Sequence, residues 1–212
     1  MTKKGWIYLG FFTALIGLFY LALTQLIPGY AQPKVHPVSY VRPFAFINQD
    51  SLPVTDRDVA GKVYVVEFFF TTCKGICPRM NQNMRVVYDA FRNESDFKIL
   101  SHTCDPDTDS VKQLKRYSDS LQVDTKQWIF LTGPKGELYK AARVSYTIDD
   151  PANNPSSVAD DFLHTQFWAL VDQNGDVRKV VDGLKPSEVD DLIGSVRDLL
   201  KNPPIKKEPG AR

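Results

Sequence analysis

Cysteine, histidine and methionine are scarce in this sequence of 212 residues, which has only three of each. Three cysteines are too few to build a small domain around a disulfide framework. The charge is also nearly balanced, because 26 Lys and Arg oppose 25 Asp and Glu and leave a formal net charge of +1. Nucleic-acid-binding surfaces are usually strongly basic, so this balance argues against a nucleic-acid partner. A chain of this length has room for one hydrophobic anchor segment and one folded domain.

Charge is absent from residues 6–27, the long hydrophobic run of the sequence. At about 1.5 Å per residue, a helix of this length spans the roughly 30 Å hydrocarbon core of a bilayer. Lys3 and Lys4 precede the run, and the next basic residue is Lys34. The positive-inside tendency therefore predicts that residues 1–5 are cytoplasmic, that the run is a transmembrane anchor and that the rest lies outside. A cleaved signal peptide is the alternative, but its hydrophobic region is usually only about 7–15 residues long.

Three regions are expected after the anchor. Residues 28–43 contain several prolines and few large apolar residues, which is typical of an extended tether. Residues 44–201 carry the apolar periodicity of a folded domain, and the tail at 202–212 is expected to be disordered. His36 lies in the tether, where we expect a solvated side chain.

Two cysteines stand where a buried strand gives way to a helix. Residues 63–70 are almost all β-branched or aromatic, which is typical of a strand buried on both faces. Cys73 and Cys77 follow, and Pro78 begins an amphipathic helical pattern. The partial positive charge of a helix N-terminus favours a thiolate over a thiol. The four-residue spacing also allows both sulfurs to face the same side of a helical turn.

Glu67 is the one charged residue inside this apolar strand, six positions before Cys73. Thioredoxins carry a buried acid at the same offset, where it handles the proton of the active-site thiol. Burial would raise the pKa of the carboxyl and make Glu67 a candidate proton relay. The alternative is a carboxylate that reaches a polar partner and takes no part in the chemistry.

The remaining patterns complete an α/β fold. They predict hairpins at residues 44–54 and 167–181, strands at 97–101 and 127–132, and helices at 110–121, 137–143 and 186–200. This order predicts a thioredoxin-like sandwich with an N-terminal β-hairpin extension, preceded by one transmembrane helix. Residues 145–161 have no apolar period and form a long loop, and loops of this length are usually functional or mobile.

The third cysteine, Cys104, follows the predicted strand at 97–101. The C-terminal ends of parallel strands share one edge of a sheet, so Cys104 could lie near Cys73 and Cys77. A role in metal binding or in a disulfide is one interpretation. A small buried hydrophobic residue, the usual role of a lone cysteine, is the other. His102 is expected to lie on one face of the sheet and not to bind metal.

The sequence resembles the Sco/SenC family at two places. Phe70-Thr-Thr-Cys73-x-x-x-Cys77-Pro78 is the first, and the segment 160–165, which contains His164, is the second, followed by Leu170-Val-Asp-x-x-Gly175. The resemblance covers about residues 44–200. This chain departs from the family pattern at one position, because the family usually has an apolar residue where this sequence has Cys104.

This resemblance implies a thioredoxin-fold copper protein tethered to a bacterial cytoplasmic membrane, with its domain on the periplasmic side. It implies that Cys73, Cys77 and His164 bind copper, and that the partner is a copper-bearing subunit of cytochrome c oxidase. His164 stands where thioredoxins have a cis-proline, so an imidazole replaces a residue that shields the thiols from metal. Two thiolates and an imidazole form a soft donor set that Cu(I) accepts and that can also hold Cu(II).

Two functions follow. The first is a metallochaperone, not an enzyme, that delivers copper to a centre of a respiratory oxidase. The second is an extracytoplasmic thiol-disulfide oxidoreductase that uses the redox-active pair Cys73 and Cys77, with Glu67 as a possible relay, to reduce cysteines of a partner copper site. A peroxiredoxin-like peroxidase is a weaker third interpretation, because the proline-rich peroxide signature is missing.

Overall fold

The computed structural model describes residues 2–26, 36–149, 163 and 165–206. The chain divides into two compact units, and the second is His36–Lys206. The described part of the first unit is helix α1, Lys3–Leu26, which has 24 residues and buries none of them. It is long and apolar enough to cross a membrane. This helix is the predicted N-terminal apolar segment.

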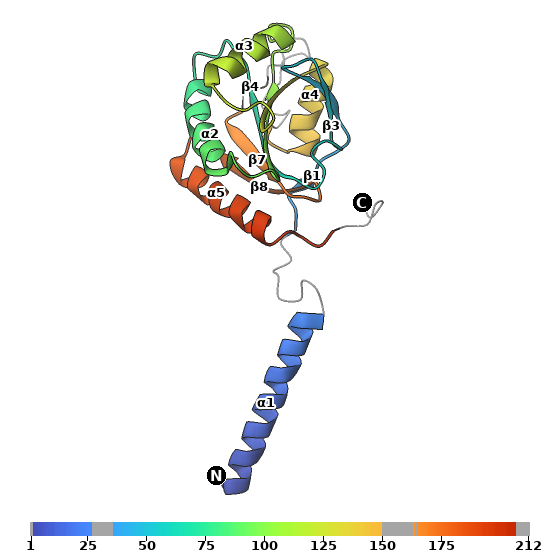
Figure 1. Ribbon diagram of the computed structural model, residues 1–212, viewed down its shortest axis with the longest axis vertical. Helices are drawn as coiled ribbons and strands as arrows, with labels where there is room; N and C mark the ends of the chain where they lie inside the picture. Colours follow the sequence, from blue (N-terminus) through green and yellow to red (C-terminus); the bar gives the residue numbers. More distant parts are fainter. Residues whose placement is uncertain (1, 27–35, 150–162, 164, 207–212) are drawn as a thin grey trace. The chain divides into compact units, whose positions relative to one another are not determined.

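The unit His36–Lys206 is built on an eight-stranded mixed sheet (Figure 1). The strands, in spatial order, are β1 (Ser39–Tyr40), β8 (Asp176–Asp182), β7 (Phe167–Val171), β4 (Val63–Phe69), β5 (Phe97–Thr103), β6 (Trp128–Thr132), β2 (Ala45–Asn48) and β3 (Pro53–Thr55). β5 is parallel to both β4 and β6, and the other neighbouring pairs are antiparallel. The loops after β4 and β5 therefore leave the sheet at the same edge.

Helices cover both faces of the sheet. One face carries α2 (Cys77–Phe91), α3 (Val111–Leu121) and α5 (Pro186–Lys201), and the other carries α4 (Lys135–Lys140) and the π-helical turn η1 (Ala141–Ser145) (Figure 1). All seven residues of β4 are buried, because successive side chains enter the two apolar cores in turn. This arrangement is the predicted thioredoxin-like α/β sandwich.

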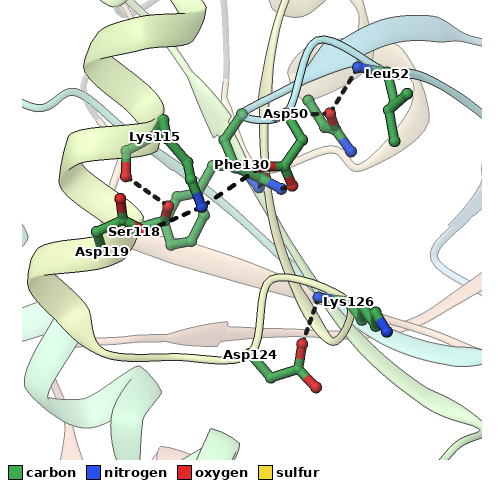
Figure 2. A network of polar contacts seen from close by, with 10 residues as sticks. Asp50, Leu52, Lys115, Ser118, Asp119, Asp124, Lys126 and Phe130 are labelled. Atoms are coloured by element: carbon green, nitrogen blue, oxygen red, sulfur yellow. Dashed lines mark hydrogen bonds and ion pairs between the residues drawn. The ribbon is translucent and has the colours of Figure 1, made fainter.

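A polar network attaches the N-terminal hairpin, β2 and β3, to the rest of the domain (Figure 2). The Asn48 side-chain oxygen accepts hydrogen bonds from the backbone N–H groups of Asp50 and Leu52, both at 2.9 Å, and shapes the hairpin turn. Lys115 of α3 forms ion pairs with Asp50 at 3.5 Å and with Asp119 at 3.0 Å. Gln49 accepts a hydrogen bond from the backbone of β6. The predicted hairpin extension is therefore an integral part of the sheet.

The structure differs from the sequence prediction at three elements. β1 lies inside the predicted tether at 28–43: Ser39 pairs with Val177 and Val41 is buried, a pairing that no apolar period in the sequence signals. β5 extends two residues beyond the predicted strand. The predicted helix at 137–143 is instead α4 followed by η1. In addition, part of the long loop at 145–161 and the end of the tail lie outside the described residues.

His102 lies in β5, on the face covered by α4, and is fully buried. Its ring stacks on Phe68 at 4.9 Å and meets Phe46 edge-on at 5.3 Å. Burial lowers the pKa of His102 to about 3, so the imidazole is neutral at physiological pH. Neither ring nitrogen has a hydrogen-bond partner among the described residues. His102 is therefore a core residue, in agreement with the sequence prediction.

Candidate metal centre

A pocket of about 280 Å³ opens at the edge of the sheet where β4 and β5 end. All three cysteines contribute to it, and most of its other lining residues are apolar. The lining residues are Phe68, Phe69, Phe70, Cys73, Lys74, Gly75, Ile76, Cys77, Cys104, Leu163 and Thr165. The pocket thus brings the dithiol loop together with residues 163 and 165, some 90 positions later in the chain.

The two cysteines of the loop differ in exposure. Cys73 is partly exposed, whereas Cys77 is 5% exposed and is the first residue of α2, with Pro78 in the first turn. Burial is the main cause that raises the pKa of Cys77 to about 12, and the neighbouring Cys73 raises it further. The sequence predicted that the helix N-terminus would favour a thiolate. At Cys77 burial acts in the opposite direction and disfavours the thiolate.

Asp109 fixes the beginning of the dithiol loop. Its buried carboxylate accepts hydrogen bonds from the backbone N–H of Thr71 at 3.1 Å, from the Thr71 hydroxyl, and from the Thr103 hydroxyl at 2.6 Å. One side chain thereby joins the loop after β4 to the end of β5. Asp109 was not predicted as part of the site, because an aspartate before a helix is usually an exposed turn residue.

Replacing Asp109 with alanine is expected to lower the free energy of unfolding by about 3 kcal/mol, because the donors of Thr71 and Thr103 lose a charged, buried acceptor. Urea denaturation of the wild type and the variant measures the change. Asp107→Ala is the matched control, since it removes an exposed carboxylate from the same loop. Equal stabilities of the two variants would contradict the role assigned to Asp109.

Cys104 forms part of the pocket wall behind the dithiol loop. It is 2% exposed, and both its backbone N–H, at 2.8 Å, and its thiol, at 3.1 Å, donate to the carbonyl oxygen of Phe69. Burial is the main cause that raises the pKa of its thiol. The predicted proximity to Cys73 and Cys77 is therefore present. Within the described ranges, however, no three His, Cys, Asp or Glu side chains already converge as a metal site.

Glu67 lies beneath the pocket, on the face of the sheet covered by α2 and α3. It is 1% exposed, and its Oε1 accepts a hydrogen bond from the Ser101 hydroxyl at 2.6 Å. Its Oε2 has no partner among the described residues. Burial raises the pKa of Glu67 to about 7, and its charge contributes to the raised pKa of Cys77. Glu67 is thus buried and also reaches a polar partner, Ser101, so its role as a proton relay stays a prediction.

No histidine among the described residues lines the pocket. His102 lies on the opposite face of the sheet from Glu67, and His36 does not line the pocket. His164 lies outside the described residues, but its neighbours on both sides do line the pocket. Leu163 is buried, and Thr165 donates its hydroxyl to the carbonyl of Ile148 at 2.7 Å.

The thioredoxin-like fold and the two thiols at a strand-to-helix junction place this chain in the class of thioredoxin-fold dithiol proteins. Residues 33–201 match the SCO1/SenC family. The chain belongs to this family.

Particular relatives share most of the domain. The SCO1 protein homolog of Bacillus subtilis is 32% identical over 166 residues, which cover 76% of this chain and 83% of that protein. The structure of BsSco, described with a disulfide switch and as a member of the Sco family of cytochrome c oxidase assembly proteins, is 32% identical with a TM-score of 0.64, covering 77% of this chain and 95% of that one. The Arabidopsis thaliana ScoI structure with copper bound is 25% identical with a TM-score of 0.60, covering 77% and 99%.

Proposed function

We propose that the protein binds copper through Cys73, Cys77 and His164 and delivers it to a copper centre of a respiratory cytochrome c oxidase. The observation that carries this proposal is the pocket itself, which Cys73, Cys77 and the two neighbours of His164 line together. Thiolate sulfurs in a largely apolar pocket are suited to Cu(I), and the addition of an imidazole also accommodates Cu(II). Copper is here the cargo that the domain carries, and the copper-bound relative supports this choice of metal.

Helix α1 supports a proposal about where in the cell the protein works. We propose that residues 6–27 anchor the protein in a bacterial cytoplasmic membrane and that the domain at 44–201 works on the periplasmic side. The apolar composition of α1 and the lysines before it support this orientation. A copper-bearing subunit of cytochrome c oxidase is then the proposed partner.

An anaerobic Cu(I) competition titration tests the proposal, using the reduced, detergent-solubilised full chain and its His164→Ala variant. We expect one Cu(I) per chain and an affinity that falls roughly 100-fold or more in the variant, about 3 kcal/mol, because one of three ligands is lost. A His36→Ala variant is the matched control, since it removes an exposed histidine that does not line the pocket. Weak binding by the wild type would overturn the proposal.

Glu67 favours a second candidate function, thiol-disulfide exchange with a partner protein. A buried carboxyl with a pKa of about 7 is suited to accept and return a thiol proton near neutral pH. This function requires Cys73 and Cys77 but not His164. Reduction of a disulfide-containing partner that survives His164→Ala and slows in Glu67→Gln would therefore support it.

A further inference from the structure

The pocket wall opposite the dithiol loop is held in place by one tyrosine. The Tyr139 hydroxyl of α4 donates to the carbonyl oxygen of Cys104 at 2.9 Å and accepts from the backbone N–H of Leu163 at 3.1 Å. Tyr139 is 5% exposed and does not line the pocket. A single oxygen atom therefore connects the end of β5 to the segment that forms the second wall.

The surroundings of Tyr139 fix its ring. The Lys135 ammonium lies 5.3 Å from the ring centroid and the Arg143 guanidinium lies 5.4 Å from it. Arg143 belongs to the π-helical turn η1 and forms an ion pair with Asp149 at 2.7 Å. A π-helical turn is uncommon and is often found at functional sites. Here it places Arg143 between Tyr139 and Asp149.

The residues on the two sides of the long loop are thus attached to α4, to η1 or to each other. Asp149 is bound by Arg143, Leu163 by Tyr139, and Thr165 by the carbonyl of Ile148. Leu163 and Thr165 line the pocket together with Cys73 and Cys77, so the hydrogen bonds of Tyr139 attach this wall to the end of β5. Groups that do not touch the metal but orient its ligands typically change metal affinity by roughly 10- to 100-fold when removed.

We propose that Tyr139 is a positioning residue of the metal pocket: its hydroxyl holds the wall formed by Leu163 and Thr165 in register with the dithiol loop. This inference rests on the copper-binding function proposed above. It assigns a role in metal binding to α4 and η1, which contribute no residue to the pocket lining.

The test compares Tyr139→Phe with Tyr88→Phe in the reduced full chain. Tyr88 is a close match, because it is 6% exposed and its hydroxyl accepts a backbone N–H, that of Asp124, at 2.9 Å. Both variants keep the ring and lose one buried hydroxyl. We expect the Cu(I) affinity to fall roughly 10-fold or more in Tyr139→Phe and less than 2-fold in Tyr88→Phe. The absorption spectrum of the Cu(II)-loaded protein should change in Tyr139→Phe alone.

The outcomes are distinguishable. Equal Cu(I) affinities and unchanged spectra in the two variants would overturn the role of Tyr139 and leave the copper-binding proposal intact. Weak Cu(I) binding by the wild type would instead reject the copper-binding proposal. Should Tyr139→Phe fail to fold, Thr165→Val removes the second attachment of the same wall, to Ile148, and is expected to lower the affinity in the same way. Unchanged affinity in that variant would overturn the inference.

Discussion

Oxidation of Cys73 and Cys77 to a disulfide is expected to abolish Cu(I) uptake. The metal binds thiolates, and in a disulfide both sulfurs are bonded to each other, so two of the three proposed ligands are lost. We expect the affinity to fall roughly 1,000-fold or more, equivalent to about 4 kcal/mol. Diamide serves as the oxidant, mass spectrometry of the digested protein verifies the linkage, and anaerobic Cu(I) competition measures the affinity.

The third thiol in the pocket requires a control. A Cys104→Val variant can form only the Cys73–Cys77 linkage, and it should lose and regain Cu(I) binding on oxidation and re-reduction just as the wild type does. Tight Cu(I) binding by protein in which this disulfide is verified would show that the ligand assignment is wrong. The relative described with a disulfide switch makes the experiment directly comparable within the family.

Two buried groups, Glu67 and His102, have pKa values that folding shifts in opposite directions, and each should make the free energy of unfolding depend on pH. The ordinary pKa of Glu67 is 4.5 and folding raises it to about 7, whereas the ordinary pKa of His102 is 6.5 and folding lowers it to about 3. Between pH 4.5 and 6.5 the folded protein holds a proton on Glu67, and the unfolded chain holds one on His102. The two states bind the same number of protons, so together these groups contribute almost no pH dependence there.

Single variants should reveal each contribution. In Glu67→Gln only His102 remains, the unfolded chain binds the extra proton, and the free energy of unfolding should rise with pH by about 1.4 kcal/mol per unit from about pH 4.5 to 6.5. In His102→Phe the folded protein binds the extra proton, and the free energy should fall at the same rate. The two variants should therefore diverge by about 5 kcal/mol over this window.

Urea denaturation at pH 4.5, 5.5 and 6.5 provides the measurement, with the wild type as the reference for all other titrating groups. His102→Leu is available if the larger ring of phenylalanine disturbs the aromatic cluster around Phe46 and Phe68. Parallel pH profiles for the wild type and both variants would show that these side chains do not titrate as their burial requires.

Local patterns predicted the part of the site that lies close together in sequence. An apolar run of strand length, interrupted only by Glu67, is typical of a strand covered on both faces, and β4 is buried along its whole length. Cys77 and Pro78 at the start of an amphipathic pattern gave the position of α2. The parallel pairing of β4 and β5 then explains why Cys104 lies in the same pocket.

The supporting residues could not be predicted, because their roles depend on contacts between distant segments. Asp109 looks like an ordinary turn residue until Thr71, 38 positions earlier, donates to it. Tyr139 looks like a core aromatic until its hydroxyl meets Leu163, 24 positions later. β1 was missed for the same reason, since its partner β8 lies near the other end of the domain. The role of His164 remains a prediction from the family resemblance.

The two outermost strands have a consequence for the behaviour of the domain in concentrated solution. β1 has two residues and β3 has three, and β3 begins with Pro53, which has no N–H to offer. A sheet with such short borders presents few free backbone groups on which a second chain could add a strand. The fully buried strand β4, Val63–Phe69, is enclosed between β7 and β5. The short edge strands β1 and β3 thus protect the domain from edge-to-edge polymerisation.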